Sequence, residues 1–136
     1  MFLTKLGQAE ASAWPSFVKN ISDQFEARLA QVKVAQSDSV LLKGMEGWSL
    51  PIASAHGEGH AAFTRENLDL IQSANQIALN FVDSSGKSTE TYPLNPNGSI
   101  DGITGITAAN GRVTIMMPHP DEASLLSLFH LSLIHI

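Results

Sequence analysis

The chain has 136 residues, which is the length of one domain or less. Its apolar fraction of 43% and charged fraction of 15% are typical of a globular protein and argue against disorder. The formal net charge of -5 provides no basic surface for nucleic acid or an anionic membrane, and the absence of cysteine excludes disulfides and thiolate metal sites.

The first third of the chain predicts a short helix and a strand. Residues 1–10 carry apolar side chains on one side of a helix, and Trp14 followed by Pro15 would end it. No secretory signal is expected there, because Lys5 and Glu10 interrupt any long apolar core. Residues 25–34 predict a strand in which alternation slips by one residue, which would fit a β-bulge. The alternating residues are Phe25, Ala27 and Leu29, followed by Val32 and Val34.

The middle of the chain predicts one helix between short strands. Residues 40–45 and 50–55 are apolar runs bounded by glycines. Thr64 can cap a helix that runs to about residue 73, with Leu68 and Ile71 facing inward. Residues 76–82 alternate as a strand does, so Ile77, Leu79 and Phe81 are expected on one face.

The last third predicts a polar strand, a shaped loop and a buried strand. Residues 84–86 form a turn signal, and residues 87–92 are expected to return as a polar strand. Residues 95–105 are rich in glycine, proline and asparagine, so we expect a loop. A tight turn at 109–111 precedes the continuous apolar run 113–117, which suits a central strand covered on both faces.

His119 is the best candidate for a catalytic side chain. It follows the expected strand and lies between Pro118 and Pro120, which stiffen the backbone. Open α/β sheets place their sites at the carboxyl ends of strands, and Asp121 could orient the imidazole. The alternative from spacing alone is an ordinary loop histidine beside an acidic turn.

Several strings resemble, in the same order, the glutaminase domain of phosphoribosylformylglycinamidine synthases. They are Ala-Trp-Pro-Ser-Phe-Val-Lys-Asn at 13–20, Gln-Phe-Glu-Ala-Arg at 24–28, Leu-Pro-Ile-Ala-Ser-Ala-His-Gly-Glu-Gly at 50–59, Thr-Glu-Thr-Tyr-Pro at 89–93 and Met-Met-Pro-His-Pro-Asp at 116–121. The resemblance implies an α/β fold, namely part of a three-layer class I glutaminase domain of flavodoxin-like type. The excess of strands over helices would fit a strand-rich fragment of such a domain.

The resemblance also implies a reaction and its participants. The family hydrolyses glutamine through a cysteine thioester and passes ammonia to a synthetase domain that uses ATP, magnesium and formylglycinamide ribonucleotide. Glutamine and that synthetase domain are therefore the expected partners, in the cytoplasm, with no nucleic acid, no membrane and no cofactor in this chain. The most apolar run, 125–136, is too short to cross a bilayer.

Only some catalytic residues of the family have counterparts here. His119 matches the catalytic histidine, and Asp121 stands where the family has glutamate, so Glu122 is an alternative partner. The family's nucleophile lies in a Gly-Val-Cys-Asn-Gly-Cys-Gln-Met string whose last residue matches Met1. The isolated chain is thus expected to be inactive.

The string His56-Gly57-Glu58-Gly59-His60 allows three interpretations. His56 and Gly57 could form a loop near the glutamine site, or the string could be a turn that ends a strand. Two histidines at this spacing can also bind zinc on a helix, but Gly57 and Gly59 disfavour a helix, so no metal is expected. A metal hydrolase using His56, His60 and His119 would require stoichiometric zinc.

The tail predicts a domain boundary at residue 122. Residues 1–122 are expected to be the C-terminal part of a glutamine amidotransferase domain, and 123–136 a non-native tail. Residues 131–136, Leu-Ser-Leu-Ile-His-Ile, can be encoded by CTGTCTCTTATACACATC, which resembles a transposon end used in sequencing libraries. A genuine amphipathic tail is the alternative. A different class of function is also open, a non-catalytic α/β binding or assembly module derived from a glutaminase.

Overall fold

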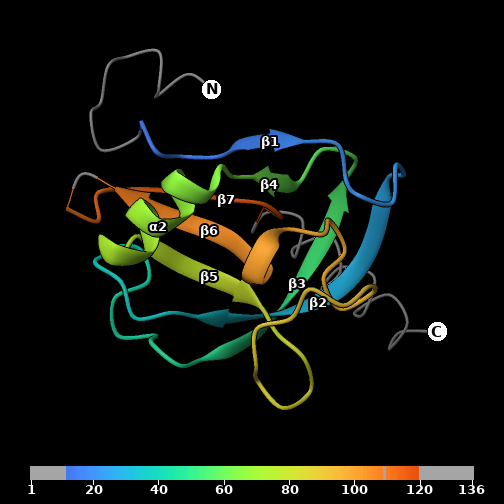
Figure 1. Cartoon of the computed structure of the whole chain (residues 1–136). Helices are drawn as coiled ribbons and strands as arrows, with labels where there is room; N and C mark the ends of the chain where they lie inside the picture. Colours follow the sequence, from blue (N-terminus) through green and yellow to red (C-terminus); the bar gives the residue numbers. More distant parts are fainter. Residues whose placement is uncertain (1–11, 109, 120–136) are drawn as a thin grey trace.

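Antiparallel strands dominate the part of the chain that the structure, a computed structural model, describes: residues 12–108 and 110–119 (Figure 1). The strands in chain order are β1 (Ser16–Val18), β2 (Glu26–Val34), β3 (Ser49–His56), β4 (His60–Ala62), β5 (Ile77–Phe81), β6 (Ile103–Ala108) and β7 (Val113–Met116). They are joined by one α-helix, α2 (Arg65–Ser73), and one 3-10 turn, η2 (Ile100–Gly102).

Five strands form one curled sheet in the order β3-β2-β5-β6-β7, and β1 pairs with β4 in a separate two-stranded sheet. Strand β2 pairs with β3 along almost its whole length but with β5 only from Val32 to Val34. Figure 1 shows β2 bending between these two partners, so that β3 and the first part of β2 rise out of the plane of β5 and β6. Strand β4 begins at His60, four residues after the end of β3, so the end of β3 leads into the two-stranded sheet.

Helix α2 covers one face of the sheet, as the sequence predicts. The Thr64 hydroxyl accepts a hydrogen bond from the Asn67 amide at 3.2 Å, so Thr64 is the N-cap. Ile71 is fully buried, and Leu68 packs against the same cluster. This cluster joins α2 to the segment before β1 and to strands β6 and β7; its other members include Trp14, Ile103, Ile106 and Ile115.

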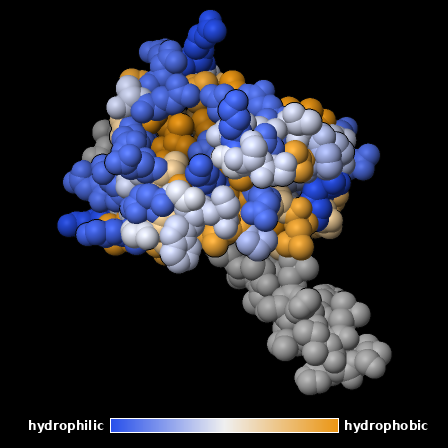
Figure 2. Space-filling view, turned by 90° about the horizontal axis from the view of Figure 1, so that it is seen from below, coloured by the Kyte–Doolittle hydropathy of each residue, from blue (hydrophilic) through white to orange (hydrophobic). Residues whose placement is uncertain are grey.

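A second apolar cluster lies on residues of β2, β3 and β5. Its buried members are Ala30, Val32, Val34, Ile52, Leu79 and Phe81, and partly buried Leu42, Met45, Leu50 and Met116 pack against them. Other large apolar side chains remain exposed, among them Leu41 and Trp48. Figure 2 shows apolar surface lying open in a hollow framed by hydrophilic residues on the lower face of the molecule.

The predicted bulge in residues 25–34 is wrong. Strand β2 pairs with β3 in an unbroken register from Glu26 to Lys33, and its even-numbered residues face inward. Phe25 and Leu29, expected inside, are 66% and 60% exposed. The phase was misjudged because the inward position nearest the start of the strand is an acid, Glu26, which interrupts the apolar pattern. The irregular register lies in β5 instead, around Leu79.

The strand expected at 113–117 is confirmed as β7, but its expected central position is wrong. Strand β7 is at the edge of the described sheet, pairs antiparallel with β6 and is half-buried throughout. Its partner β6 falls partly within the expected loop 95–105 and was not predicted as a strand. Residues 87–92 make only an isolated bridge between Val82 and Ser88 rather than a strand.

Ile77 was expected to share a face with Leu79, but Ile77 packs in the first apolar cluster and Leu79 in the second.

The expected turn before β7 is confirmed. Asn110 and Gly111 have φ angles of 54° and 80° in the connection between β6 and β7. Positive φ at successive residues is typical of tight hairpins. The expected helix at 1–10 and the tail at 123–136 lie outside the described residues. No helix within the described ranges is long and apolar enough to cross a membrane.

Candidate glutaminase site

His119 lies directly after β7, as the apolar run followed by prolines predicts. Pro118 before it is buried, whereas His119 itself is exposed. Its neighbours Asp121 and Glu122, the two candidate partners, lie outside the described residues. The catalytic role of His119 therefore stays a prediction, although its position at a strand end is confirmed.

His56 ends β3, one edge strand of the described sheet, and the charge of His119, which follows the other edge strand β7, acts on it. The His56 side chain is only 7% exposed, and its Nε2 atom lies 3.1 Å from the Ser54 hydroxyl. Burial lowers the pKa of His56 below its ordinary value of 6.5, and the charge of His119 lowers it further, against a weaker opposing effect of Glu26. The imidazole is therefore neutral at neutral pH.

The turn at 56–59, which we call the histidine–glycine turn, is held by Asn20. The Asn20 side-chain amide donates to the His56 carbonyl at 2.7 Å, and its oxygen accepts from the Gly59 amide at 3.0 Å. The Asn20 backbone amide donates to the Gly57 carbonyl at 2.9 Å. Gly57 is thus part of a fixed turn, and its contact with substrate stays a prediction.

A partly buried ion pair lies beside His56. Glu26 is the cross-strand partner of His56 and is 2% exposed, and its carboxylate accepts from the Arg28 guanidinium at 2.7–2.8 Å. Arg28 also donates to the Tyr92 hydroxyl at 2.7 Å and lies 4.8 Å from the centre of its ring. The Ser22 hydroxyl, Arg28 and Tyr92 together keep the pKa of Glu26 below its ordinary range.

Sequence reasoning missed Asn20, Glu26 and Arg28 as parts of this site. All three lie within strings that carry the family resemblance. The one signal in the residues themselves was an acid at an inward position of a strand, since a buried carboxylate requires a nearby cation or hydrogen-bond donors.

His60 follows the histidine–glycine turn and begins β4. Its Nδ1 atom is buried and has no hydrogen-bond partner in the structure. Among residues 12–108 and 110–119, no group of three or more histidine, aspartate or glutamate side chains is placed to hold a metal ion.

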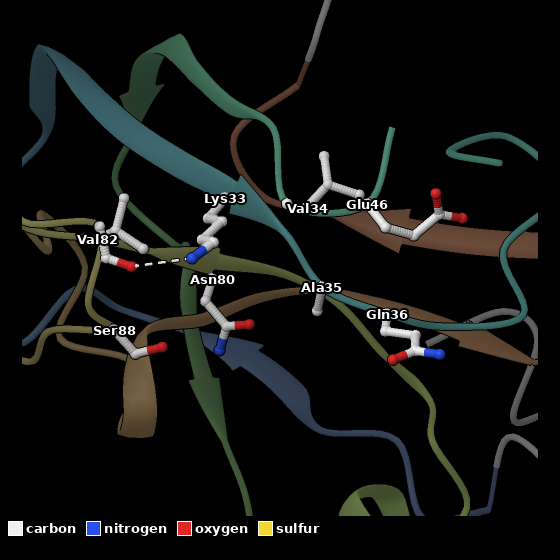
Figure 3. Close-up of a pocket in the computed structure, with 10 residues that line it drawn as sticks. Lys33, Val34, Ala35, Gln36, Glu46, Asn80, Val82 and Ser88 are labelled. Atoms are coloured by element: carbon white, nitrogen blue, oxygen red, sulfur yellow. Dashed lines mark hydrogen bonds between the residues drawn. The ribbon is translucent and has the colours of Figure 1, made fainter. Parts of the chain in front are cut away.

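A separate cleft of about 470 Å³ lies beside the end of β2 (Figure 3). Polar side chains of Lys33, Gln36, Glu46, Asn80 and Ser88 line it. The Lys33 ammonium donates to the Gly86 carbonyl at 3.4 Å, and none of the residues predicted for the glutaminase site lines this cleft.

The comparisons with known proteins show the family and the fold of the chain. The chain is similar to a solved structure titled "Structure of PurLQS from Thermotoga maritima", with 24% identity and a TM-score of 0.59 over 80% of this chain and 43% of that chain. It therefore spans less than half the length of that chain, and the likeness shows a shared fold. The model of the CobB/CobQ-like glutamine amidotransferase domain matches residues 2–130. The expected α/β glutaminase fold class is confirmed, and the chain belongs to the family of CobB/CobQ-like glutamine amidotransferase domains.

Proposed function

We propose that this chain is the histidine-bearing part of the glutaminase domain of a phosphoribosylformylglycinamidine synthase. The observation that carries the proposal is the position of His119, three residues after the end of β7 and following the buried Pro118. The order of the quoted strings and the membership of a glutamine amidotransferase family support the same conclusion.

In the proposed reaction a cysteine thiolate attacks the carboxamide carbon of glutamine. His119 takes the thiol proton and returns it to the departing ammonia, and water then hydrolyses the thioester to glutamate. Asp121 or Glu122 would orient the imidazole. The ammonia would pass to a synthetase domain that uses ATP and magnesium to convert formylglycinamide ribonucleotide to its amidine in the cytoplasm. The chain itself contributes no cofactor and, with no cysteine, no nucleophile.

The isolated chain should therefore not hydrolyse glutamine. Removing one member of a catalytic triad typically costs several powers of ten in rate. Glutamate release from the purified chain measures this directly. Turnover at about 1 per second or more, an ordinary enzyme rate, would show that another residue serves as nucleophile.

The coding DNA upstream of Met1 tests the parentage of the chain separately from its activity. A reading frame that encodes Gly-Val-Cys-Asn-Gly-Cys and joins Met1 would supply the nucleophile expected by the proposal. In that extended protein, His119→Asn should abolish glutaminase activity while leaving the fold intact. Unchanged activity in that variant would remove His119 from the mechanism.

A non-catalytic binding or assembly module derived from a glutaminase is the second candidate. The cleft beside the end of β2 favours this second candidate. Lys33 lines that cleft, and a half-buried cation among polar side chains can bind a ligand without any nucleophile. A glutaminase-active extended protein would decide against this candidate.

A further inference from the structure

One asparagine uses its whole side chain to join two segments at the candidate site. Asn20 is 2% exposed and lies in the connection between β1 and β2. Its side-chain nitrogen donates to the carbonyls of Gln24 at 2.9 Å and His56 at 2.7 Å, and its oxygen accepts from the Gly59 amide at 3.0 Å. A carboxamide carries two N–H donors and one acceptor oxygen, so both kinds of group are satisfied.

These bonds fix both ends of the histidine–glycine turn. The His56 carbonyl and the Gly59 amide bracket the turn, and the backbone amide of Asn20 holds the Gly57 carbonyl between them at 2.9 Å. Aspartate at position 20 would keep the acceptor and lose both donors, and alanine would lose all three side-chain bonds.

The position of Gly59 in turn limits the His56 ring. A Cβ atom on Gly59 would overlap the imidazole, so the ring packs directly against the glycine backbone. The Ser54 hydroxyl contacts Nε2 of the same ring at 3.1 Å. If Gly59 moves away, the ring loses the surface that covers it.

We propose that Asn20 is a positioning residue that holds the histidine–glycine turn and the His56 ring in place. Its meaning for catalysis rests on the proposed glutaminase function, but the placement itself does not. Glu26 on β2 and His119 after β7 are the charged groups whose fields reach His56, and neither contacts Asn20 through a hydrogen bond recorded in the structure.

The test compares Asn20→Ala with Asn95→Ala in the full chain. Asn95 is a matched control, because it is 1% exposed and makes three analogous bonds in another loop, to Thr89, Gly98 and Ser99. NMR titration of the histidine rings and hydrogen exchange of the Gly59 amide are the measurements. In Asn20→Ala, the pH at the midpoint of the His56 titration should rise towards the ordinary value for histidine. Hydrogen exchange of the Gly59 amide should accelerate about tenfold or more.

Asn95→Ala should leave both signals as in the parent chain, even if it lowers overall stability. An unchanged His56 titration in Asn20→Ala, or an equal change in both variants, would overturn the proposal. If Asn20→Ala does not fold, Asn20→Ser, whose side chain is shorter but uncharged, should show the same two changes, and their absence would be equally decisive. No glutamine enters this test, so failure of the glutaminase proposal would appear separately, as absence of activity in the extended protein.

Discussion

Buried polar side chains define the candidate site at the scale of single residues. Glu26 and Asn20 are each 2% exposed. Asn20 bonds the His56 carbonyl, and Glu26 pairs with Arg28 on its own strand and accepts from the Tyr92 hydroxyl. A buried carboxylate is tolerated only when its charge is paired, and Arg28 supplies that pairing here at 2.7 Å. Such residues specify one arrangement of the loops, because any other arrangement leaves a polar atom without a partner.

The neutral state of His56 predicts how stability depends on pH. Its pKa in the folded chain is below the ordinary value of 6.5, mainly through burial, so the unfolded chain takes up a proton that the folded chain does not. The free energy of unfolding should therefore fall as pH decreases below about 6.5. In His56→Gln this part of the decrease should disappear, although stability at neutral pH will be lower. Urea unfolding between about pH 7 and pH 5 measures it, and parallel profiles for both proteins would contradict the assignment.

The glycines of the histidine–glycine turn should respond very differently to alanine. A Cβ on Gly59 would overlap the His56 ring, whereas a Cβ on Gly57 meets no atom within 4 Å. Gly59→Ala should cost about 1–3 kcal/mol, as overpacking of a closed site does, and Gly57→Ala should be close to neutral. Denaturant unfolding of the two variants compares them, and equal losses would mean that the ring moves aside at no cost.

At the scale of elements, the hairpin of β6 and β7 is anchored at its turn. The Gly111 carbonyl accepts from the Val40 amide at 2.9 Å, and the Gly111 Cα faces the backbone of Asp38. The hairpin carries His119 at the end of its second strand, so its anchoring helps to place that histidine.

Alanine at Gly111 should therefore destabilise the hairpin more than backbone strain alone explains. Gly111 has φ of 80°, and a Cβ there would overlap the Asp38 carbonyl. Gly44 is the matched control, because its φ is 83° and no atom lies within 4 Å of its Cβ position. Gly44→Ala should cost about 1 kcal/mol from its positive φ, and Gly111→Ala about 1–3 kcal/mol more. Thermal unfolding measures both, and equal costs would show that residues 38–40 yield easily.

At the scale of the whole molecule, the curl of the sheet creates the site. Strands β3 and β7 are the two edges of the described sheet, yet the charge of His119, after β7, acts on His56 at the end of β3. The bend of β2 curls the sheet between these two edges (Figure 1). A flat sheet in the same order would separate these residues by three strands.

The C-terminal residues give a prediction about the boundary of the domain. The family match ends at residue 130. Residues 123–130 therefore lie inside the match, although they belong to the stretch 123–136 that the sequence predicts to be a non-native tail. Residues 131–136 lie outside the match. Deleting 131–136 should leave stability unchanged and improve solubility, since it removes an apolar segment that lies outside the family match. Deleting 123–136 should do the same. Thermal unfolding and sedimentation of both chains test this, and a loss of stability in the longer deletion alone would assign 123–130 to the domain.

The sequence by itself determined those elements whose signals lie within a few neighbouring residues. Thr64 and the spacing of Leu68 and Ile71 predicted helix α2, and Asn110 with Gly111 predicted the hairpin turn, because capping and positive φ depend on neighbouring residues only. The strand end before His119 was predicted in the same way, and the family followed from rare strings in order.

Only the tertiary structure decided which strands are neighbours and which faces are buried. The inward phase of β2 depends on Arg28 and Tyr92 satisfying Glu26, and Tyr92 is far away in the sequence. The edge position of β7 depends on strand pairing, because β7 pairs with β6 alone in the described sheet. The hydrogen bonds between Asn20 and the histidine–glycine turn join residues separated by more than thirty positions. Pairing between distant segments is selected by packing and by complete hydrogen bonding of the whole fold, and no short stretch of sequence contains that information.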